Sequence, residues 1–553
     1  SVIKGEGTDL NALFDGKTET GWFPGWNASQ YPVKAVVKLD AEYYLTKVRY
    51  YDSVGKPKLT ITSVIGNERT EIISRDLNGY AAWQEWEIST PKKVQFLEIE
   101  ISDIQGDRPI TELEFYGSKD TKPEPVEPKI TKFSGDALKL GVNGFHWIPR
   151  DLNPTANMRM YQMLQWTWTS TGIAVEPTFQ ADGNYDSYLL DSTKKGQTIV
   201  LCPNKIPDWL ANTSVGPEWS DQRLHRNGLN PEDPLSYREI SEYAFQIAAR
   251  YGSTVHPELN LKVNSTSRWN GDIVNVPKSG LNLIKYFEVE NEPDRPWKAD
   301  LYKYTPEQFA ALMSAIYDGH EGKLGTGCGI KRADPDKKKG VKVVMSGLSS
   351  INLDYLKRMK VWFEVNRSDK KFCGDVVQVH RYCNSKNPKD RPDIDLTGGG
   401  VSPDQDGLFE LLLEFKSWVS ANLPKDTEVW FGEFGYDTVA PTTFLSQYPQ
   451  VYGSRTAEEL QGEWLMRTYL YAIAAGMDKS FMFNLCDENS SPSGNLFSSS
   501  GLLTSEVDGF KKKQSWKDID WLSRQLNGWK FVNLQKFGNI RIIKFRRGVQ
   551  FKY

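Results

Sequence analysis

Two glutamates, Glu292 and Glu433, each come at the end of a short apolar run that is typical of a buried strand. The first run is Tyr286–Val289, and Pro293 cannot donate the hydrogen bond that would extend a strand past Glu292. A pair of carboxylates is what hydrolysis of a glycosidic bond requires, since one protonated group donates to the leaving oxygen and one ionised group attacks the anomeric carbon. A separation of ~5–5.5 Å gives retention of configuration and ~6.5–9.5 Å gives inversion, and the sequence leaves this distance open.

From about residue 130 to 528, strand patterns alternate with helix patterns, which is typical of a parallel (β/α)8 TIM barrel. Eight runs are predicted to be its strands: Leu138–Asn143, Met158–Met163, Thr198–Cys202, Tyr286–Val289, Lys342–Ser346, Val376–His380, Glu428–Glu433 and Lys479–Asn484. The predicted helices include one near Ser236–Tyr251, one over Thr456–Gly476 and one over Trp516–Asn527. Because barrels keep reactive groups at the carboxyl ends of their strands, we expect Glu292 and Glu433 to face each other across the barrel mouth. Long loops at 253–280, 384–408 and 485–500 would deepen a cleft there.

The two ends of the chain have a different, all-β pattern. Residues 1–117 predict a β-sandwich, because short alternating runs, such as Ala35–Leu39 and Lys47–Tyr51, are separated by polar or glycine-bearing turns. Residues 118–129 read SKDTKPEPVEPK, a proline-rich linker that we expect to be extended and semi-rigid. Residues 529–553 return to strands, with a hairpin predicted from Asn539–Phe545 and Val549–Tyr553 at the start of a C-terminal β segment. The expected fold class is therefore multidomain, with a barrel at 130–528 between two β regions.

Asn11–Trp22 resembles the opening "DG…T.W" signature of discoidin-like domains (coagulation factor 5/8 type C), and Ile110–Gly117 resembles their closing strand. The resemblance covers about 117 residues and implies a galactose-binding-like sandwich. Such domains often bind sugars through loops at one end, as carbohydrate-binding modules do, although many only pack against a neighbouring domain. The candidate loop aromatics are Trp22, Phe23 and Trp26. The resemblance also implies a structural calcium ion, for which Asp15 is the nearest match.

The ends of the fourth and seventh predicted strands, Asn291-Glu292-Pro293 and Phe431–Gly435, resemble those of clan A glycoside hydrolases, the retaining (β/α)8 group. This resemblance covers about 400 residues. It implies that Glu292 is the acid/base and Glu433 the nucleophile. It also implies that Asn291 binds the substrate 2-hydroxyl, a contact that can strengthen in the transition state.

Two further matches to the clan concern the environment of the nucleophile. His380-Arg381-Tyr382 ends the sixth predicted strand and matches the clan's His-x-Tyr pattern, in which the imidazole or the hydroxyl keeps the nucleophile ionised. Arg159 lies on the second predicted strand, where the clan often has an arginine near the nucleophile. A cation at that place would lower the pKa of the carboxylate.

The eighth predicted strand departs from the clan, because many members end it with a tryptophan under the sugar. Here the chain reads FNLCDE over Phe483–Glu488, so Asn484, Asp487 or Glu488 either contact the substrate or cap the loop. Three residues of strand-end loops are predicted to stack on sugar, with burial as the alternative: Trp209, His146 and Trp147. The remaining histidines are expected to be ordinary surface residues: His225, His256 and His320.

Composition narrows the class of partner. The 553 residues carry 68 basic and 71 acidic side chains, a net charge of -3, which gives no basic field for nucleic acid. The 12% aromatic content suits stacking on the C–H faces of sugars, although a large core explains part of it. The five scattered cysteines match neither a disulfide framework nor a metal cluster. No stretch approaches the ~20 apolar residues of a transmembrane helix. The first residue is Ser1, which predicts either a removed export signal or a trimmed chain.

These patterns predict an exported, secreted or cell-surface bacterial enzyme, a retaining endo-β-glycosidase whose substrate is a polysaccharide or oligosaccharide. Its chemistry requires no metal or organic cofactor in the active site. Three alternatives stay open: an exo-acting β-glycosidase that releases terminal sugars, a non-catalytic carbohydrate-binding protein on a barrel scaffold, and an adhesion protein led by its first domain. The last of these leaves both strand-end glutamates unexplained. The sugar, its linkage and its sulfation are not fixed by any residue.

Overall fold

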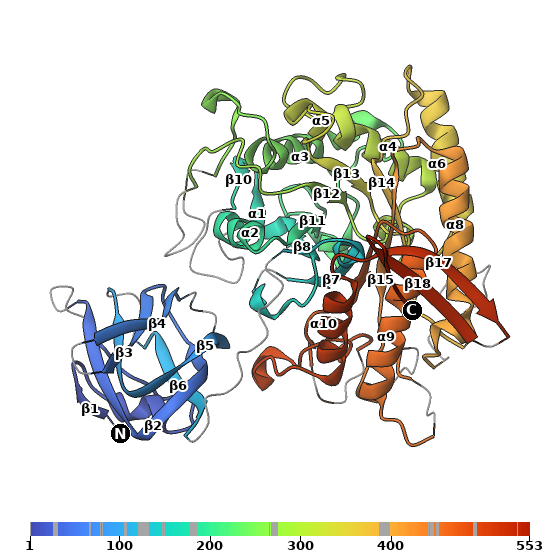
Figure 1. Cartoon of the computed structure of the whole chain (residues 1–553). Helices are drawn as coiled ribbons and strands as arrows, with labels where there is room; N and C mark the ends of the chain where they lie inside the picture. Colours follow the sequence, from blue (N-terminus) through green and yellow to red (C-terminus); the bar gives the residue numbers. More distant parts are fainter. Residues whose placement is uncertain are drawn as a thin grey trace. The chain divides into compact units, whose positions relative to one another are not determined.

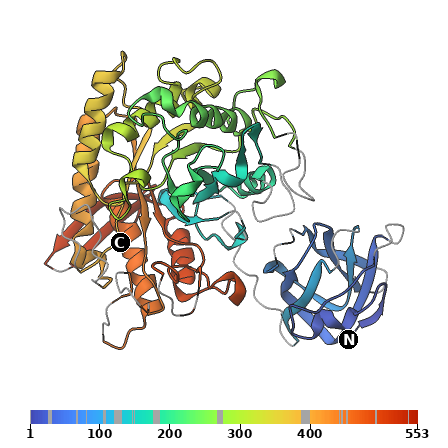
Figure 2. The ribbon, with the colours of Figure 1, turned by 180° about the vertical axis from the view of Figure 1, so that it is seen from behind.

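A computed structural model shows the architecture of the chain (Figures 1 and 2). The structure describes residues 2–553 except 26–30, 66–67, 78, 80, 104–107, 120–131, 146, 149, 176–184, 265, 267–274, 386–398, 441, 443–446, 450–452, 490, 492–494 and 539. Most of the predicted linker 118–129 therefore lies outside the described residues. The chain divides into two compact units, Ser1–Thr131 with Glu506–Phe510, and Lys132–Ser505 with Lys511–Tyr553.

The first unit is rich in sheet. Its six strands are β1 (Val2–Gly5), β2 (Val33–Asp52), β3 (Lys58–Ile65), β4 (Glu68–Asp76), β5 (Ala82–Ile101) and β6 (Ile110–Ser118). They pair in the order β1-β2-β5-β3-β4, with β6 also paired to β2. The predicted runs 35–39 and 47–51 are the two ends of one strand, β2, because register shifts after Lys38 and Leu45 let the chain bend without leaving the sheet. Alternate side chains of β2 enter the core, as the sequence alternation predicts.

The second unit is built around a closed barrel of eight parallel strands (Figure 1). The strands are β7 (Leu140–Gly144), β8 (Asn157–Met163), β11 (Thr198–Asn204), β12 (Tyr286–Val289), β13 (Lys342–Met345), β14 (Val376–His380), β15 (Glu428–Phe434) and β16 (Lys479–Met482). All eight predicted barrel strands are confirmed, with ends that differ by at most two residues. A short hairpin of β9 (Trp168–Thr169) and β10 (Gly172–Ile173) follows β8.

Helices surround these strands, as Figures 1 and 2 show. They are α1 (Leu164–Thr167), α2 (Tyr185–Lys194), α3 (Arg238–Tyr251), α4 (Pro306–Asp318), α5 (Ile330–Ala333), α6 (Leu353–Asn366), α7 (Pro403–Asp406), α8 (Leu408–Asn422), α9 (Ala457–Ala474) and α10 (Gln514–Leu526). The three helices predicted near Ser236–Tyr251, Thr456–Gly476 and Trp516–Asn527 are α3, α9 and α10. At the start of α9, Thr456 and Glu459 form the predicted capping box.

Apolar side chains fill the barrel interior. One core cluster joins five strands and consists of Val200, Val344, Val376, Trp430 and Phe481. Because successive strand residues point to opposite faces, the next inward position above Val376 is Gln378, and the one above that is His380. The inward positions of β14 therefore become polar toward its carboxyl end.

The end of the chain forms a three-stranded antiparallel sheet of β17 (Lys530–Phe537), β18 (Ile540–Arg547) and β19 (Gln550–Lys552). The predicted hairpin is the pair β18–β19. The sequence pattern missed β17, in which only Phe531 and Leu534 are partly covered. None of the helices that the structure describes combines the length and the apolar composition needed to cross a membrane.

Candidate active site at the carboxyl end of the barrel

The two predicted glutamates meet at one end of the barrel. Glu292 follows β12, and Glu433 lies near the end of β15. His380, the last residue of β14, places Nδ1 2.8 Å from Oε1 of Glu292 and 3.6 Å from Oε2 of Glu433. One oxygen of each glutamate and a ring nitrogen of His380 all lie within 4.8 Å of one another. The two carboxylates are thus close enough to act on the same bond.

The loop that carries Glu292 is held by an arginine that the sequence analysis did not single out. Glu290 and Glu292 have positive φ angles of 69° and 47°, a backbone conformation that most residues avoid. Arg295 donates to the carbonyl oxygen of Asn291 from Nη2 (2.8 Å) and to that of Glu292 from Nε (3.1 Å). It also pairs with the Glu290 carboxylate, so one buried guanidinium fixes the turn that presents Asn291 and Glu292.

Three hydrogen-bond donors surround Glu433, whose side chain is 6% exposed. Oε1 accepts hydrogen bonds from Tyr161 and, at 2.7 Å, from Nη1 of Arg159, while Oε2 accepts one from Tyr382 at 2.9 Å. Burial by itself would raise the pKa of Glu433, but the charges of His380 and Arg159 and the two tyrosine hydroxyls outweigh it and hold that pKa below its usual value. The site therefore keeps Glu433 ionised.

Arg159 is shared between two carboxylates. On the side away from Glu433 it forms a two-pronged ion pair with Glu288, with Nε to Oε2 at 2.6 Å and Nη2 to Oε1 at 2.7 Å. Nη2 also donates to Oδ1 of Asn291 at 2.6 Å, so the amide NH2 of Asn291, which has no hydrogen-bond acceptor among the described residues, is available to a substrate. The sequence analysis missed Glu288, which lies inside the apolar run of β12 and is fully buried.

His380 has no exposed surface. Burial lowers the pKa of His380, but the neighbouring Glu433 and Glu292 carboxylates outweigh it and raise that pKa above its usual value. Two glycines make room for the ring: a Cβ added at Gly347 would lie 1.9 Å from Nε2, and one at Gly432 would lie 2.8 Å from it. Glycine at these positions is what allows an imidazole to lie between the two glutamates.

A cavity of about 430 Å³ opens over both carboxylates. Its polar lining consists of Asn204, Asn291, Glu292 and Glu433. Aromatic rings form most of the remainder: Phe145, Tyr161, Trp297, Tyr382, Phe483 and Phe497. Sequence reasoning missed Tyr161, although its spacing of two from Arg159 places both side chains on the same face of β8. It also missed Trp297 and Phe497, because loop residues carry no periodic signal that assigns them to a site.

The structure gathers Glu292, Glu433, Asn291, His380, Tyr382 and Arg159 in one cluster. Three other predicted residues are not part of the cavity lining. Trp209 packs edge-on against Trp168, with ring centroids 5.0 Å apart, and Trp147 stacks on the cavity residue Phe145 at 4.3 Å. Asn484 is 5% exposed and accepts a hydrogen bond from the amide of Cys486, so its side chain caps the loop after β16. His146 lies outside the described residues.

The expectation that the other histidines are ordinary surface residues is wrong for His320. This residue is 6% exposed, and its Nδ1 lies 2.9 Å from the hydroxyl of Ser314 on α4. Burial lowers the pKa of His320 below its usual value. A tertiary contact of this kind has no local sequence signature.

Glu292, His380 and Glu433 also offer the ligand types of a metal site. The arrangement of donors does not fit a cation there. Both oxygens of Glu433 already accept hydrogen bonds, and the guanidinium of Arg159 would repel a cation at the same carboxylate. The donor set instead fits a carboxylate pair separated by an imidazole.

In the first unit, the prediction that Trp22 is an exposed loop aromatic is wrong. Trp22 is 1% exposed and belongs to the core, where its Nε1 donates to the carbonyl oxygen of Glu6. Phe23 is half-buried, and Trp26 lies outside the described residues. The Asp15 carboxylate accepts hydrogen bonds from Thr20 Oγ1 (2.7 Å) and the Lys17 amide (2.9 Å), and the calcium ion predicted near it stays a prediction.

Comparison with known proteins gives similarity at the level of structure only. No protein-family model matches the sequence, and no curated protein matches it. A family 39 glycoside hydrolase from the gut symbiont Bacteroides cellulosilyticus WH2 is 14% identical, with 92% of this chain and 86% of that chain covered and a TM-score of 0.48. A GH30 endoxylanase from Clostridium papyrosolvens C71 is 11% identical, with 76% and 81% covered and a TM-score of 0.38.

The first unit has its own neighbours. The family 32 carbohydrate-binding module of NanJ from C. perfringens, solved in complex with galactose, is 19% identical, with 21% of this chain and 90% of that chain covered and a TM-score of 0.19. At these identities and TM-scores, the likenesses carry no weight for function.

Proposed function

We propose that the protein is a retaining glycoside hydrolase, with Glu433 as nucleophile and Glu292 as acid/base. The observation that carries the proposal is the approach of the two carboxylates to within 4.8 Å across one cavity. Retaining enzymes need carboxyl groups ~5–5.5 Å apart, whereas inverting enzymes need ~6.5–9.5 Å to fit a water molecule between the base and the sugar. The short separation supports the double displacement.

The proposed roles follow from the two environments. Glu433 is surrounded by cationic and hydroxyl donors and is kept ionised, as a nucleophile must be. Its carboxylate attacks the anomeric carbon while Glu292 gives its proton to the leaving oxygen, which forms a covalent glycosyl-enzyme. Glu292 then takes a proton from a water molecule, whose oxygen attacks the face of the sugar that the leaving group occupied and so displaces Glu433 from the opposite face. Asn291 is proposed to donate its free amide hydrogens to the 2-hydroxyl.

The proposed substrate is a β-linked polysaccharide or oligosaccharide, cleaved within the chain. One observation favours the exo-acting alternative. The cavity of about 430 Å³ is near the lower end of the ~300–1,000 Å³ typical of ligand pockets, and such a volume suits a chain end better than a long segment. For the first unit we propose a carbohydrate-binding module, on the strength of the Asn11–Trp22 and Ile110–Gly117 motifs. Export from the cell is proposed with it.

The test is to incubate the protein with a panel of β-linked polysaccharides, size the products over time and record the anomer formed first by NMR. Early β-anomer supports retention, and early α-anomer contradicts it. Mid-sized oligosaccharides indicate cleavage within chains, whereas only monomer or dimer indicates the exo-acting alternative. Binding without any product would leave the carbohydrate-binding protein as the better explanation.

A variant distinguishes the role of Glu292 from that of Glu433. Glu292→Gln cannot donate a proton, so hydrolysis of substrates with poor leaving groups should fall ~10²–10⁴-fold, while an activated aryl glycoside should be affected much less. Glu414→Gln, an exposed position on α8, is the matched control. Equal losses on both substrate types would exclude Glu292 as the acid.

A further inference from the structure

The lining of the cavity offers few groups that could bind sugar hydroxyls. Apart from two tyrosine hydroxyls and the indole N–H of Trp297, the polar groups of the described lining are two amides and two carboxylates. Both tyrosine hydroxyls that reach the cavity, those of Tyr161 and Tyr382, donate to Glu433, so these residues present ring faces to the occupant. Oδ1 of Asn291 is likewise used by Arg159. An ordinary hexose would leave several hydroxyls without partners here, which is costly in a desolvated site.

Asn204 is the one amide acceptor left for the occupant. It ends β11, and its Oδ1 is buried and lacks a hydrogen-bond partner among the described residues. A buried amide oxygen is normally satisfied, so this oxygen is suited to accept from a single sugar hydroxyl. Oδ1 of Asn204 and the amide hydrogens of Asn291 can together bind about two hydroxyl groups of the sugar.

The charge of the cavity is negative and is not balanced from within its lining. No lysine, arginine or histidine belongs to the described lining. Arg159 lies behind Glu433 with no exposed surface and is fully engaged by Glu288, Glu433 and Asn291. His380 is likewise fully buried. A carboxylate or sulfate on the sugar would therefore be desolvated beside Glu433 without a counter-ion.

We propose that the sugar bound next to the two carboxylates is neutral and poor in hydroxyl groups, of the pentose or 6-deoxyhexose class, and is not a uronic acid or a sulfated sugar. This inference rests on the proposed function, because it takes the cavity to be the catalytic one. Aromatic residues form half of the described lining, and a sugar without a polar group on C5 presents the apolar surface that such rings bind best.

The experiment uses p-nitrophenyl β-glycosides in two series, within each of which the compounds differ only in the substituent on C5. In the first series the xyloside carries hydrogen there, the quinovoside methyl, the glucoside hydroxymethyl and the glucuronide carboxylate. In the second series the D-fucoside, galactoside and galacturonide carry methyl, hydroxymethyl and carboxylate with the opposite configuration at C4. We expect kcat/KM for the hydrogen or methyl compounds to exceed that for the hydroxymethyl compounds by about tenfold and that for the carboxylates by at least about 100-fold. A carboxylate substrate within tenfold of the best neutral one would overturn the inference.

A binding measurement on the wild-type protein distinguishes failure of this inference from failure of the proposed function. The corresponding thiophenyl glycosides resist hydrolysis, so their dissociation constants report on the cavity even if no substrate is cleaved. Tight binding of the neutral compounds over the carboxylates would support the inference whether or not turnover is seen. Equal or tighter binding of the carboxylates would overturn it.

A variant tests the argument that the cavity disfavours a negatively charged sugar because its lining has no cation. Met163 is half-buried, lines the cavity at the end of β8 and has no charge. Met163→Lys should raise the ratio of glucuronide to xyloside kcat/KM at least tenfold, because it supplies the missing cation. Met163→Gln, of similar length and neutral, is the matched control and should leave the ratio unchanged. An unchanged ratio in the lysine variant, with the protein folded, would overturn the charge argument.

Discussion

Arg159 and Glu433 lie 2.7 Å apart, from Nη1 to Oε1, where their side chains are 0% and 6% exposed. At such a place a charge pair interacts far more strongly than it would in water. Glu288 is bound to the other side of the same guanidinium, so a single cation serves two buried carboxylates. Glu288 therefore holds in place the guanidinium that, together with His380 and the two tyrosines, lowers the pKa of Glu433.

The first prediction concerns the acid limb of the pH–rate profile. Removing both charges in Arg159→Gln/Glu288→Gln avoids leaving an unpaired buried carboxylate at position 288. Glu433 must be ionised to attack, so activity is lost as the pH falls through its pKa. Without the Arg159 cation this pKa rises, and the acid limb of kcat/KM should move to higher pH by about 1 unit or more.

The control for this shift is the surface pair of Arg358 and the half-buried Glu307, which lie 2.8 Å apart on α6 and α4. Replacing both with glutamine removes the same two charges at the surface, where an ion pair contributes little. The acid limb of this control should stay in place. An unmoved limb in Arg159→Gln/Glu288→Gln as well would show that Arg159 does not set the pKa of the nucleophile.

The second prediction concerns the tyrosines on Glu433. Tyr161→Phe removes a donor from Oε1, and Tyr382→Phe removes one from Oε2. A hydrogen bond to a charged group contributes ~1.5–3 kcal/mol, so each change should lower kcat about 10–100-fold. KM should change little, because both hydroxyls point to the enzyme's own carboxylate. Steady-state kinetics measures this, with Tyr116→Phe in the first unit as control; losses confined to KM would contradict the assignment.

The third prediction uses the space around His380. A Cβ at Gly347 would lie 1.9 Å from Nε2 of His380, and Gly347 does not have a positive φ, so the backbone tolerates alanine but the imidazole does not. In Gly347→Ala the ring must shift and its contact with Glu292 is lost, which should lower kcat at least ~10²-fold, since small misplacements at a site cost about that much. Far-UV circular dichroism should stay native.

The matched control is Gly327→Ala, because a Cβ at Gly327 meets nothing within 4 Å. This variant should keep full activity. If Gly347→Ala also kept full activity, the position of His380 between the two glutamates would be irrelevant to turnover.

The barrel could be predicted because each of its strands has a local sequence pattern. Short apolar runs that end in polar residues predict parallel strands and the end of the barrel at which their last side chains meet. This pattern placed Glu292, Glu433 and His380 at the same end of the predicted barrel. Asn291, Tyr382 and Arg159 were predicted from the resemblance to clan A glycoside hydrolases. The prediction gave two separate runs, 35–39 and 47–51, for the single strand β2, because a bulge interrupts the alternation of side chains without ending the strand.

The remainder of the site was not predictable for physical reasons. Glu288 is an acid within an apolar run, and nothing local reveals that a guanidinium from another strand neutralises it. Trp297 and Phe497 come from loops, whose paths depend on tertiary packing. Trp22 was expected at a loop surface but fills a core, because an isolated aromatic residue has no period from which its burial can be inferred.

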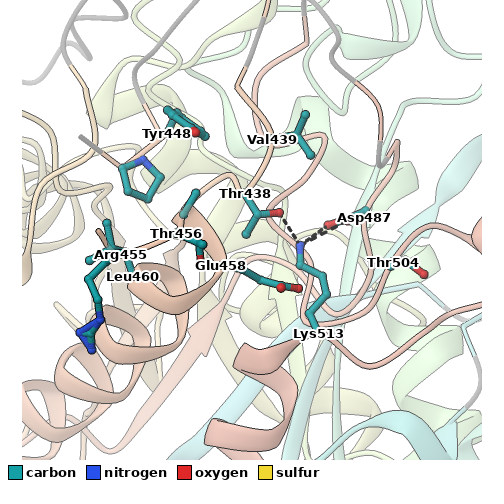
Figure 3. Close-up of a pocket in the computed structure, with 12 residues that line it drawn as sticks. Thr438, Val439, Tyr448, Arg455, Thr456, Glu458, Leu460, Asp487, Thr504 and Lys513 are labelled. Atoms are coloured by element: carbon teal, nitrogen blue, oxygen red, sulfur yellow. Dashed lines mark hydrogen bonds and ion pairs between the residues drawn. The ribbon is translucent and has the colours of Figure 1, made fainter. Parts of the chain in front are cut away.

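The fourth prediction concerns a buried ion pair beside a second cavity (Figure 3). Lys513 donates from Nζ to Oδ1 of Asp487 at 3.0 Å and to Oγ1 of Thr438 at 2.8 Å, and its side chain is 5% exposed. Burial lowers the pKa of Lys513. Asp487→Asn leaves this ammonium without its counter-charge, and Lys513→Met leaves a buried carboxylate, so each should reduce the free energy of unfolding by ~3–5 kcal/mol.

The double variant Asp487→Leu/Lys513→Met removes both charges and should recover most of that loss, because replacing a buried pair with apolar groups is often neutral. The pH dependence has a definite sign. A folded-state pKa below that of the unfolded chain means that the unfolded state binds more protons, so stability rises with pH between the two values. Asp487→Asn lowers the folded pKa of Lys513 further, and its free energy of unfolding, measured in urea at several pH values, should rise more steeply toward alkaline pH than that of the wild type. Equal slopes would mean that Lys513 does not titrate with folding.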